Sequence, residues 1–152
     1  MKKIFLLFLI LLSGIANASA DQYSDNPSRY VQTIRSDRYV AYIDKDALRV
    51  LRYDPPYYVL EADTVYVLYE LNQMMRTKER FFYNMDAGTM KSIPMHFTMY
   101  DENGKILSDE DSNQVQATVW KPREQGWYIA DHVFMLEYNL PFTVWRRQST
   151  GR

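Results

Sequence analysis

Residues 39–71 read YVAYIDKDALRVLRYDPPYYVLEADTVYVLYEL, and this stretch decides the fold. Val, Ile, Leu and Tyr recur through it, and these residue types suit a half-buried pleated surface. Asp44-Lys45-Asp46 and Asp54-Pro55-Pro56 interrupt the apolar pattern. Asp bonds its own backbone in turns, and Pro fixes φ without donating a hydrogen bond. The stretch therefore predicts three antiparallel strands, joined by two turns, at 39–43, 47–53 and 57–71.

The chain on either side of this stretch supplies further strands. Alternating apolar and polar side chains predict them at 30–34, 78–85, 90–100, 105–107 and, more weakly, 115–120. Tight turns are expected at Asp86–Thr89 and at Asp101–Gly104, where a glycine can adopt positive φ. The run from Ser108 to Gln114 reads as an acidic loop.

One helix is expected after the strands, over about residues 130–140. Asp131 is the predicted N-cap, and Pro141 ends the helix. We expect its apolar stripe to cover one face of the sheet, with three residues buried at helical spacing: Val133, Leu136 and Leu140. The predicted fold class is therefore α+β, an antiparallel meander of about six strands with one C-terminal helix packed on a face.

The N-terminus has the three parts of a secretory signal peptide, over residues 1–20. A pair of lysines precedes an unbroken apolar run over 4–12, which is shorter than the roughly 20 residues of a membrane span. Small residues then predict cleavage after Ala18 or Ala20. We expect export to the periplasm, the cell surface or the medium, and no transmembrane segment in the mature chain.

The mature chain reads as a single unit. We predict a flexible polar lead-in over 21–29, one domain over 30–142 and a loose basic tail over 143–152. About 132 residues remain after cleavage of the 152, enough for one hydrophobic core.

The composition excludes several classes of protein. The chain has no cysteine, which excludes a disulfide, a thiol nucleophile and a thiolate metal site. Subtracting Lys2 and Lys3 from the 18 basic residues leaves 16 against 19 acidic ones, a net charge near −3. That charge does not favour nucleic acid. Two histidines are too few for a three-histidine catalytic zinc. We therefore predict no cofactor and a fold that forms without metal.

Four short motifs together resemble a known family. They are Tyr42-Ile43-Asp44, RYDPPYYV from Arg52, RFFYN from Arg80 and Leu140-Pro141-Phe142. The chain from 39 to 142 is similar to small secreted bacterial proteins with a surface-adhesin protein E-like domain. The resemblance implies an antiparallel sheet with a C-terminal helix and export to the cell envelope. It also implies binding of extracellular host proteins, as in some members. This chain lacks the cysteine pair that members often carry, which argues against a disulfide-dependent dimer.

Aromatic residues are frequent, with 13 Tyr, 7 Phe and 3 Trp, and most are expected in the core. Two consecutive prolines cannot continue a strand ladder, so the chain must leave the sheet there. Adjacent strand residues point to opposite faces, so one of Tyr57 and Tyr58 should be exposed. We predict a binding surface for a protein partner, with a purely architectural turn as the alternative, at Tyr53, Pro55, Pro56, Tyr57 and Tyr58.

No motif for catalysis or metal binding stands out. Asp101 begins a run similar to a calcium loop, but the sixth and twelfth positions hold Ile106 and Ser112 instead of Gly and Glu. The carboxylates of 109–111 could hold a cation weakly, and a solvated loop is the better explanation. A Ser92, His96 and Asp101 triad lacks the flanking glycines of a nucleophile elbow.

The remaining polar candidates have plain structural explanations. His132 falls in the first turn of the expected helix. Like His96, it has little to recommend it as a functional residue and is explained as a structural histidine. Arg76, Lys78 and Arg80 could form a basic patch for an anionic partner, but a solvated strand edge is the better explanation. Neither set predicts an enzyme.

The sequence therefore predicts an exported, non-enzymatic binding or adhesion module. Its partner would be a protein, either a host extracellular protein or a component of the bacterial envelope. The alternative is a structural periplasmic protein that packs against an envelope partner. The ligand and the oligomeric state stay open.

Overall fold

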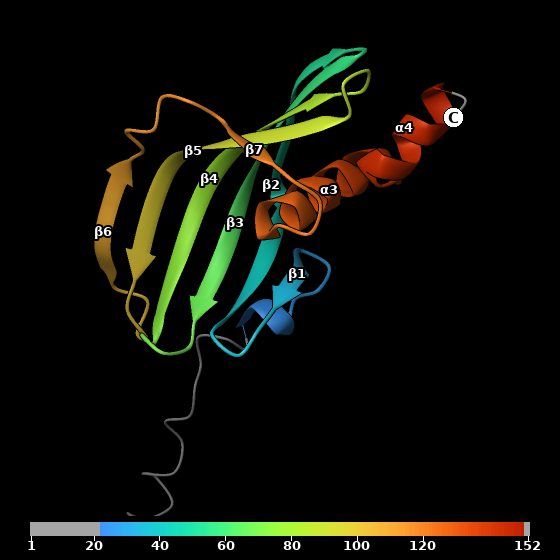
Figure 1. The fold of residues 1–152 in the computed structure, drawn as a ribbon. Coiled ribbons are helices and arrows are strands. Elements are labelled where there is room, and N and C mark those ends of the chain that lie inside the picture. The colour runs from blue at the N-terminus through green and yellow to red at the C-terminus, as the bar shows by residue number, and fades with distance from the viewer. Residues whose placement is uncertain (1–21, 151–152) are drawn as a thin grey trace, which may run out of the picture.

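The computed structural model of the protein describes residues 22–150 (Figure 1). Six strands form an antiparallel sheet in their sequence order, and a short seventh strand pairs with the fifth. The predicted meander and its class are confirmed. The strands are β1 (Tyr30–Arg35), β2 (Tyr39–Asp54), β3 (Tyr57–Leu68), β4 (Gln73–Asn84), β5 (Thr89–Tyr100), β6 (Ile106–Asp111) and β7 (Thr118–Trp120).

β2 is one long strand, so the turn predicted at Asp44-Lys45-Asp46 is wrong. Its pairing with β3 shifts register between Asp44 and Arg49 and again between Val50 and Arg52. The Asp44 side chain is occupied by arginines from other elements and accepts the N–H of Asp46. The chain therefore continues as a bulged strand and not as a hairpin. The Pro55-Pro56 turn does join β2 to β3.

Two helices follow the strands, α3 (Gln125–Tyr138) and α4 (Phe142–Thr150). α3 begins six residues before the predicted N-cap Asp131, with Glu124 as the residue before its first turn. Asn139 ends the helix in a left-handed conformation, and its N–H donates to the carbonyl of Met135. The tail, which was predicted to be loose, forms α4. The Trp145 side chain of α4 packs against Phe134 of α3.

α3 covers one face of the sheet, as predicted (Figure 1). Val133 is fully buried in this layer, whereas Leu136 and Leu140 are only partly buried. Phe134 lies at its centre, because its ring contacts rings from the sheet and from both helices. The core cluster includes Ile43, Tyr58, Leu60, Phe81, Tyr83, Met90, Ile129, Val133, Phe134 and Phe142.

The N-terminal segment covers part of the opposite face. Residues 22–24 form a helical turn, and Tyr23 is buried there between Tyr30 and Tyr42 at ring-centroid distances of 4.8 and 5.6 Å. A second apolar cluster, with Val65 and Met74 among its members, lies beneath this turn. The described part of the lead-in is therefore packed, contrary to the expected flexibility. The expected signal peptide and its cleavage sites lie outside the described residues.

Two further findings concern β6 and the helices. The run predicted as an acidic loop supplies most of β6, whose residues pair with β5 from Ile106 to Asp111. Within residues 22–150, no helix combines the length and the apolar character that crossing a bilayer requires.

Candidate functional site

The predicted binding residues lie at the end of the hairpin formed by β2 and β3. Tyr53 and Tyr57 are 61% and 47% exposed, whereas Tyr58 is 3% exposed. The Tyr58 ring packs edge-to-face on Phe134, and so it belongs to the core under α3. Of the two adjacent tyrosines, Tyr57 is therefore exposed to solvent and Tyr58 is buried in the core. The binding role of this surface stays a prediction.

We call residues 47–59 the hairpin arm. It carries four of the large apolar side chains that are exposed to solvent: Val50, Leu51, Tyr53 and Tyr57. Arg52 pairs with Asp54, and its guanidinium carbon lies 5.6 Å from the centre of the Tyr57 ring. On the other side of Tyr57, a hollow of about 330 Å³ is lined by Phe82 and Lys91, among others. Exposed apolar groups gathered in this way are typical of an interaction surface.

The hairpin arm also has a free backbone edge. β1 pairs with β2 only at residues 40–44, and the N–H of Lys45 donates to the carbonyl of Arg29. Beyond this point β2 pairs with β3 on one side, and no strand within 22–150 pairs with the other edge. An unpaired strand edge presents a row of N–H and C=O groups that another extended chain can use.

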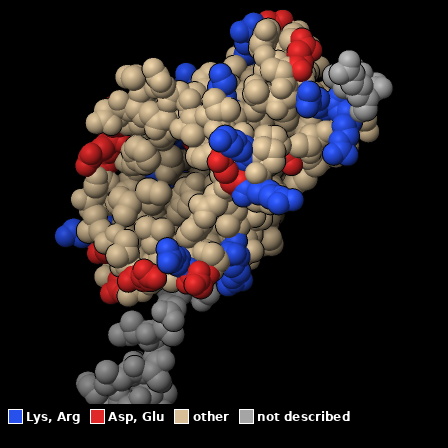
Figure 2. Space-filling view, viewed as in Figure 1, with Lys and Arg blue, Asp and Glu red and all other residues tan. Residues whose placement is uncertain are grey.

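A larger hollow lies on the face that α3 covers, and we call it the α3 cleft. It has a volume of about 670 Å³ and opens between the sheet and the first turn of α3. Figure 2 looks onto this face and shows a hollow with mostly uncharged walls and charged side chains at its margin. Its lining residues are Tyr66, Glu79, Thr118, Val119, Trp120, Lys121, Arg123, Glu124, Gln125, Gly126 and Ile129.

Glu79 is the buried carboxyl group of the α3 cleft, at 9% exposure. Its Oε1 accepts a hydrogen bond of 2.5 Å from the Ser92 hydroxyl, which in turn accepts one of 2.7 Å from the Trp120 indole N–H. Burial raises the pKa of Glu79, and the Ser92 hydrogen bond offsets part of that rise. Burial and the nearby Glu79 also raise the pKa of Tyr66.

The position of Trp120 depends on a glycine in α3. A Cβ added to Gly126 would lie 2.1 Å from Cε2 of the Trp120 ring, far closer than atoms can approach. Gly126 therefore lets the indole lie flat against the first turn of α3. β7 fixes the same tryptophan from the sheet side, because Trp120 pairs with Met90 of β5. The indole N–H is aimed at Ser92 by both contacts.

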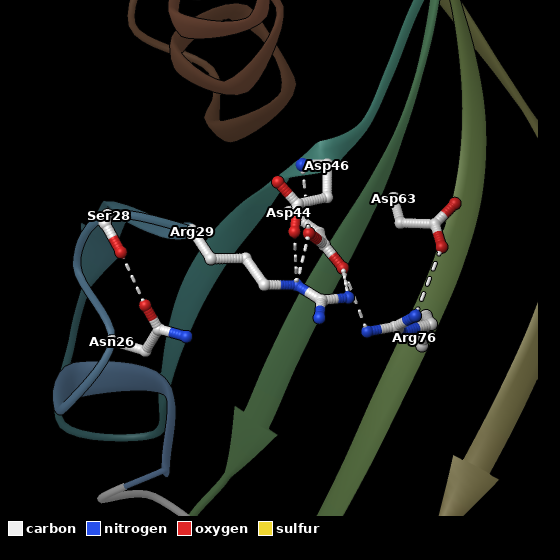
Figure 3. A network of polar contacts seen from close by, with 7 residues as sticks. All are labelled: Asn26, Ser28, Arg29, Asp44, Asp46, Asp63 and Arg76. Atoms are coloured by element: carbon white, nitrogen blue, oxygen red, sulfur yellow. Dashed lines mark hydrogen bonds and ion pairs between the residues drawn. The ribbon is translucent and has the colours of Figure 1, made fainter.

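The opposite face buries a second carboxylate, Asp44, in a network of ion pairs (Figure 3). Arg29 donates two hydrogen bonds to it, of 2.9 and 2.8 Å, and Arg76 donates a third of 3.2 Å. Arg76 also reaches Asp63 at 3.4 Å. Burial by itself raises the pKa of Asp44, but the two arginines outweigh it and hold that pKa below its ordinary value. This network joins the N-terminal segment to three strands.

The strand arginines are thus neutralised, and they do not form the basic patch considered from sequence. Arg76 belongs to the Asp44 network, and Arg80 pairs with Glu61 at 3.0 Å. The Ser92, His96 and Asp101 triad, which the sequence argued against, is not assembled in the structure either. Ser92 bonds Glu79, while both ring nitrogens of His96 lie 2.8 Å from carboxylate oxygens of Asp109 and Asp111.

Asp109 and Asp111 are therefore engaged by His96, while Glu110 accepts a hydrogen bond from the Ser108 hydroxyl. The pKa of His96 is raised by its hydrogen bonds to Asp111 and Asp109. Across residues 22–150, no three His, Asp or Glu side chains are grouped so as to hold a metal ion. His132 bonds the carbonyl of Tyr128 within its own helix.

Sequence reasoning missed Glu79, and one signal could have found it. β4 alternates between its two faces, and Glu79 falls with Phe81 and Tyr83 on the face that α3 covers. A charged residue on an apolar strand face indicates a paired ion or a polar site. The same reasoning supplies no partner for it, since Ser92 and Trp120 follow 13 residues or more later in the chain.

Comparisons of the chain with family models, with curated proteins and with solved structures return no match. The resemblance to the surface-adhesin protein E-like domain accordingly stays a prediction from the motifs in the sequence.

Proposed function

We propose that the protein is an exported, non-enzymatic binding module that takes an extended segment of a partner protein along the hairpin arm. The observation that carries the proposal is the free edge of β2 beside four exposed apolar side chains. Strand addition supplies affinity through main-chain hydrogen bonds and selectivity through side-chain pockets. Val50 and Tyr53 align with Leu60 and Tyr58 of β3, so they flank that edge on the α3 side.

The other edge of the sheet is a poorer candidate. β6 ends in Asp109-Glu110-Asp111, and charged side chains on an edge strand discourage pairing with another chain. The hairpin arm instead offers Tyr57 beside a hollow of about 330 Å³, which has room for a side chain of the partner. Tyrosines lose little side-chain entropy on binding, and so they are effective anchors.

Export is the second part of the proposal, and the N-terminal pattern of residues 1–20 supports it. Mass spectrometry of the protein from a bacterial host tests it directly. We expect a mature chain that begins after Ala18 or Ala20, and a chain that retains Met1 in the exported fraction would contradict export with cleavage.

The binding test uses the mature protein as bait, once against envelope extract and once against purified extracellular matrix proteins. Val50→Lys/Leu51→Lys places two charges on the free edge and should abolish capture of the specific partner. Ile106→Lys/Leu107→Lys is the matched control, because both its residues are about half exposed on the other edge strand. It should leave capture unchanged.

Equal capture by both double variants and the original protein would move the site away from the hairpin arm. Loss with both variants would point to general charge repulsion. Matching melting curves establish that each variant is folded. A partner from the matrix set supports adhesion, and one from the envelope extract supports the structural periplasmic role.

A further inference from the structure

We infer that the α3 cleft is a binding site for a small organic amine, a primary ammonium group carried on an apolar body, with Glu79 as its counter-ion. This site lies apart from the hairpin arm and does not depend on the proposed function. Its lining combines one buried carboxyl group with aromatic and aliphatic side chains from β3, β7 and α3.

The hydrogen bonds fix which oxygen of Glu79 is available. An indole N–H can only donate, so Trp120 occupies a lone pair of the Ser92 hydroxyl. The Ser92 proton is then directed at Oε1 of Glu79, which must accept it. Oε2 has no partner among residues 22–150, and Glu79 lines the cleft. A ligand is therefore met by a single free oxygen.

No cation of residues 22–150 forms an ion pair with this carboxyl group. Among the ion pairs of residues 22–150, none includes Glu79, whereas the comparable Asp44 has two arginines. A buried carboxylate without a counter-ion is costly, and an ammonium group that donates to it forms a strong charge-assisted bond. A ligand that supplies the missing positive charge gains the most from this site.

The walls of the cleft suit the rest of such a ligand. Tyr66 and Trp120 contribute aromatic rings, whose faces attract cations, and Val119 and Ile129 contribute aliphatic surface. Lys121 and Arg123 are exposed residues at the margin, where water screens their charge. A volume of about 670 Å³ falls within the range of small-ligand pockets, roughly 300–1,000 Å³.

The test compares 2-phenylethylamine with 2-phenylethanol, which has nearly the same shape and no charge. Isothermal titration of the unaltered protein at pH 7 should give an affinity for the amine on the order of tenfold higher than for the alcohol. Equal affinities, or no binding of the amine at millimolar concentration, would overturn the inference. This comparison needs no variant.

Two variants then locate the effect. Glu79→Gln keeps the shape and the bond from Ser92 and should remove the preference for the amine while leaving the alcohol unchanged. Glu124→Gln, at the margin of the cleft, is the matched control and should keep the preference. A preference that survives Glu79→Gln, or that is lost equally with Glu124→Gln, would place the amine elsewhere.

Discussion

Asp44 and Glu79 lie on opposite faces of the same sheet, and neither is more than 9% exposed. Asp44 aligns through Asp63 with Lys78 of β4, and Glu79, the next residue, points the other way. Asp44 is held by two arginines and has a lowered pKa, whereas Glu79 is held by one hydroxyl and has a raised pKa. The pairing of a buried carboxylate, more than its burial, separates a structural group from one that is available to a ligand.

The largest effect on stability is expected at Phe134, at the centre of the packing between α3 and the sheet. Phe134→Ala removes a fully buried ring that contacts five other aromatic rings, of Tyr58, Tyr83, Tyr138, Phe142 and Trp145. The free energy of unfolding should fall by about 3–5 kcal/mol, measured by urea denaturation. Tyr128→Ala on the same helix removes a ring that is 46% exposed and should cost less than about 1 kcal/mol. If the two variants lost the same free energy of unfolding, Phe134 would not be the residue that anchors α3 to the sheet.

On the opposite face, Asp44→Asn should have the next largest effect. The substitution leaves Arg29 and Arg76 without their shared carboxylate. Breaking a buried pair costs about 3–5 kcal/mol, and the partial exposure of both arginines favours the lower end. Asp46→Asn is the control, since that carboxylate is largely exposed and its pair with Arg29 is worth about 0–1 kcal/mol. If both variants unfold at the same urea concentration, the buried network around Asp44 stabilises the fold no more than an exposed ion pair does.

The two carboxylates should respond to pH in opposite directions. The lowered pKa of Asp44 stabilises the fold above about pH 4, the ordinary range of Asp, and this contribution is lost as pH falls through the folded pKa. The difference in unfolding free energy between the original protein and Asp44→Asn should therefore shrink below pH 4. Urea midpoints between pH 7 and pH 2.5 measure it. A constant difference would show that Asp44 has an ordinary pKa.

Glu79→Gln should have the smallest effect, less than about 1 kcal/mol at neutral pH, because no ion pair is lost and the bond from Ser92 is kept. The pKa of Glu79 is raised, so its ionisation penalises the fold as pH rises above about 4.3 through the folded pKa. As pH rises from 4 to 7, the free energy of unfolding of Glu79→Gln should therefore increase relative to that of the original protein, as measured by urea denaturation. Asp63 and Asp131, whose pKa values are also raised, are present in both proteins and cancel. A large loss of stability would mean that Glu79 has a structural partner.

The strands that depend on their own alternation were predictable from the sequence. The pattern in 57–71, 78–85 and 90–100 placed β3, β4 and β5, because a strand face is decided by neighbours two residues apart. Asp44 was misread because its arginine partners are 15 and 32 residues away, and nothing in Asp-Lys-Asp indicates them. The start of α3 was missed for a different reason. Gly126 is not typical of a helix, and its contact with the Trp120 ring, which explains it, is seen only in the structure.

The α3 cleft could not have been predicted from local patterns. Its lining residues Tyr66, Glu79 and Trp120 come from three strands, and Ser92, which links Glu79 to Trp120, comes from a fourth. These residues lie close together because of the register between the strands and because β7 pairs with β5. Neither the register nor this pairing can be inferred from the spacing of the residues along the chain. The exposed hairpin arm was accessible to sequence reasoning, because two prolines mark the end of a ladder within a single short motif.

The order of the elements along the chain has a consequence for biosynthesis. Strands β1 to β6 each pair with a sequence neighbour, so the sheet can assemble by successive hairpins as the chain lengthens. α3 and α4 are made after all seven strands, yet α3 packs against β1 and β2, near the start of the described chain. Until they emerge, Leu60, Phe81 and Tyr83 have no cover. The growing chain thus carries a bare apolar sheet, which is the kind of surface that chaperones protect from aggregation.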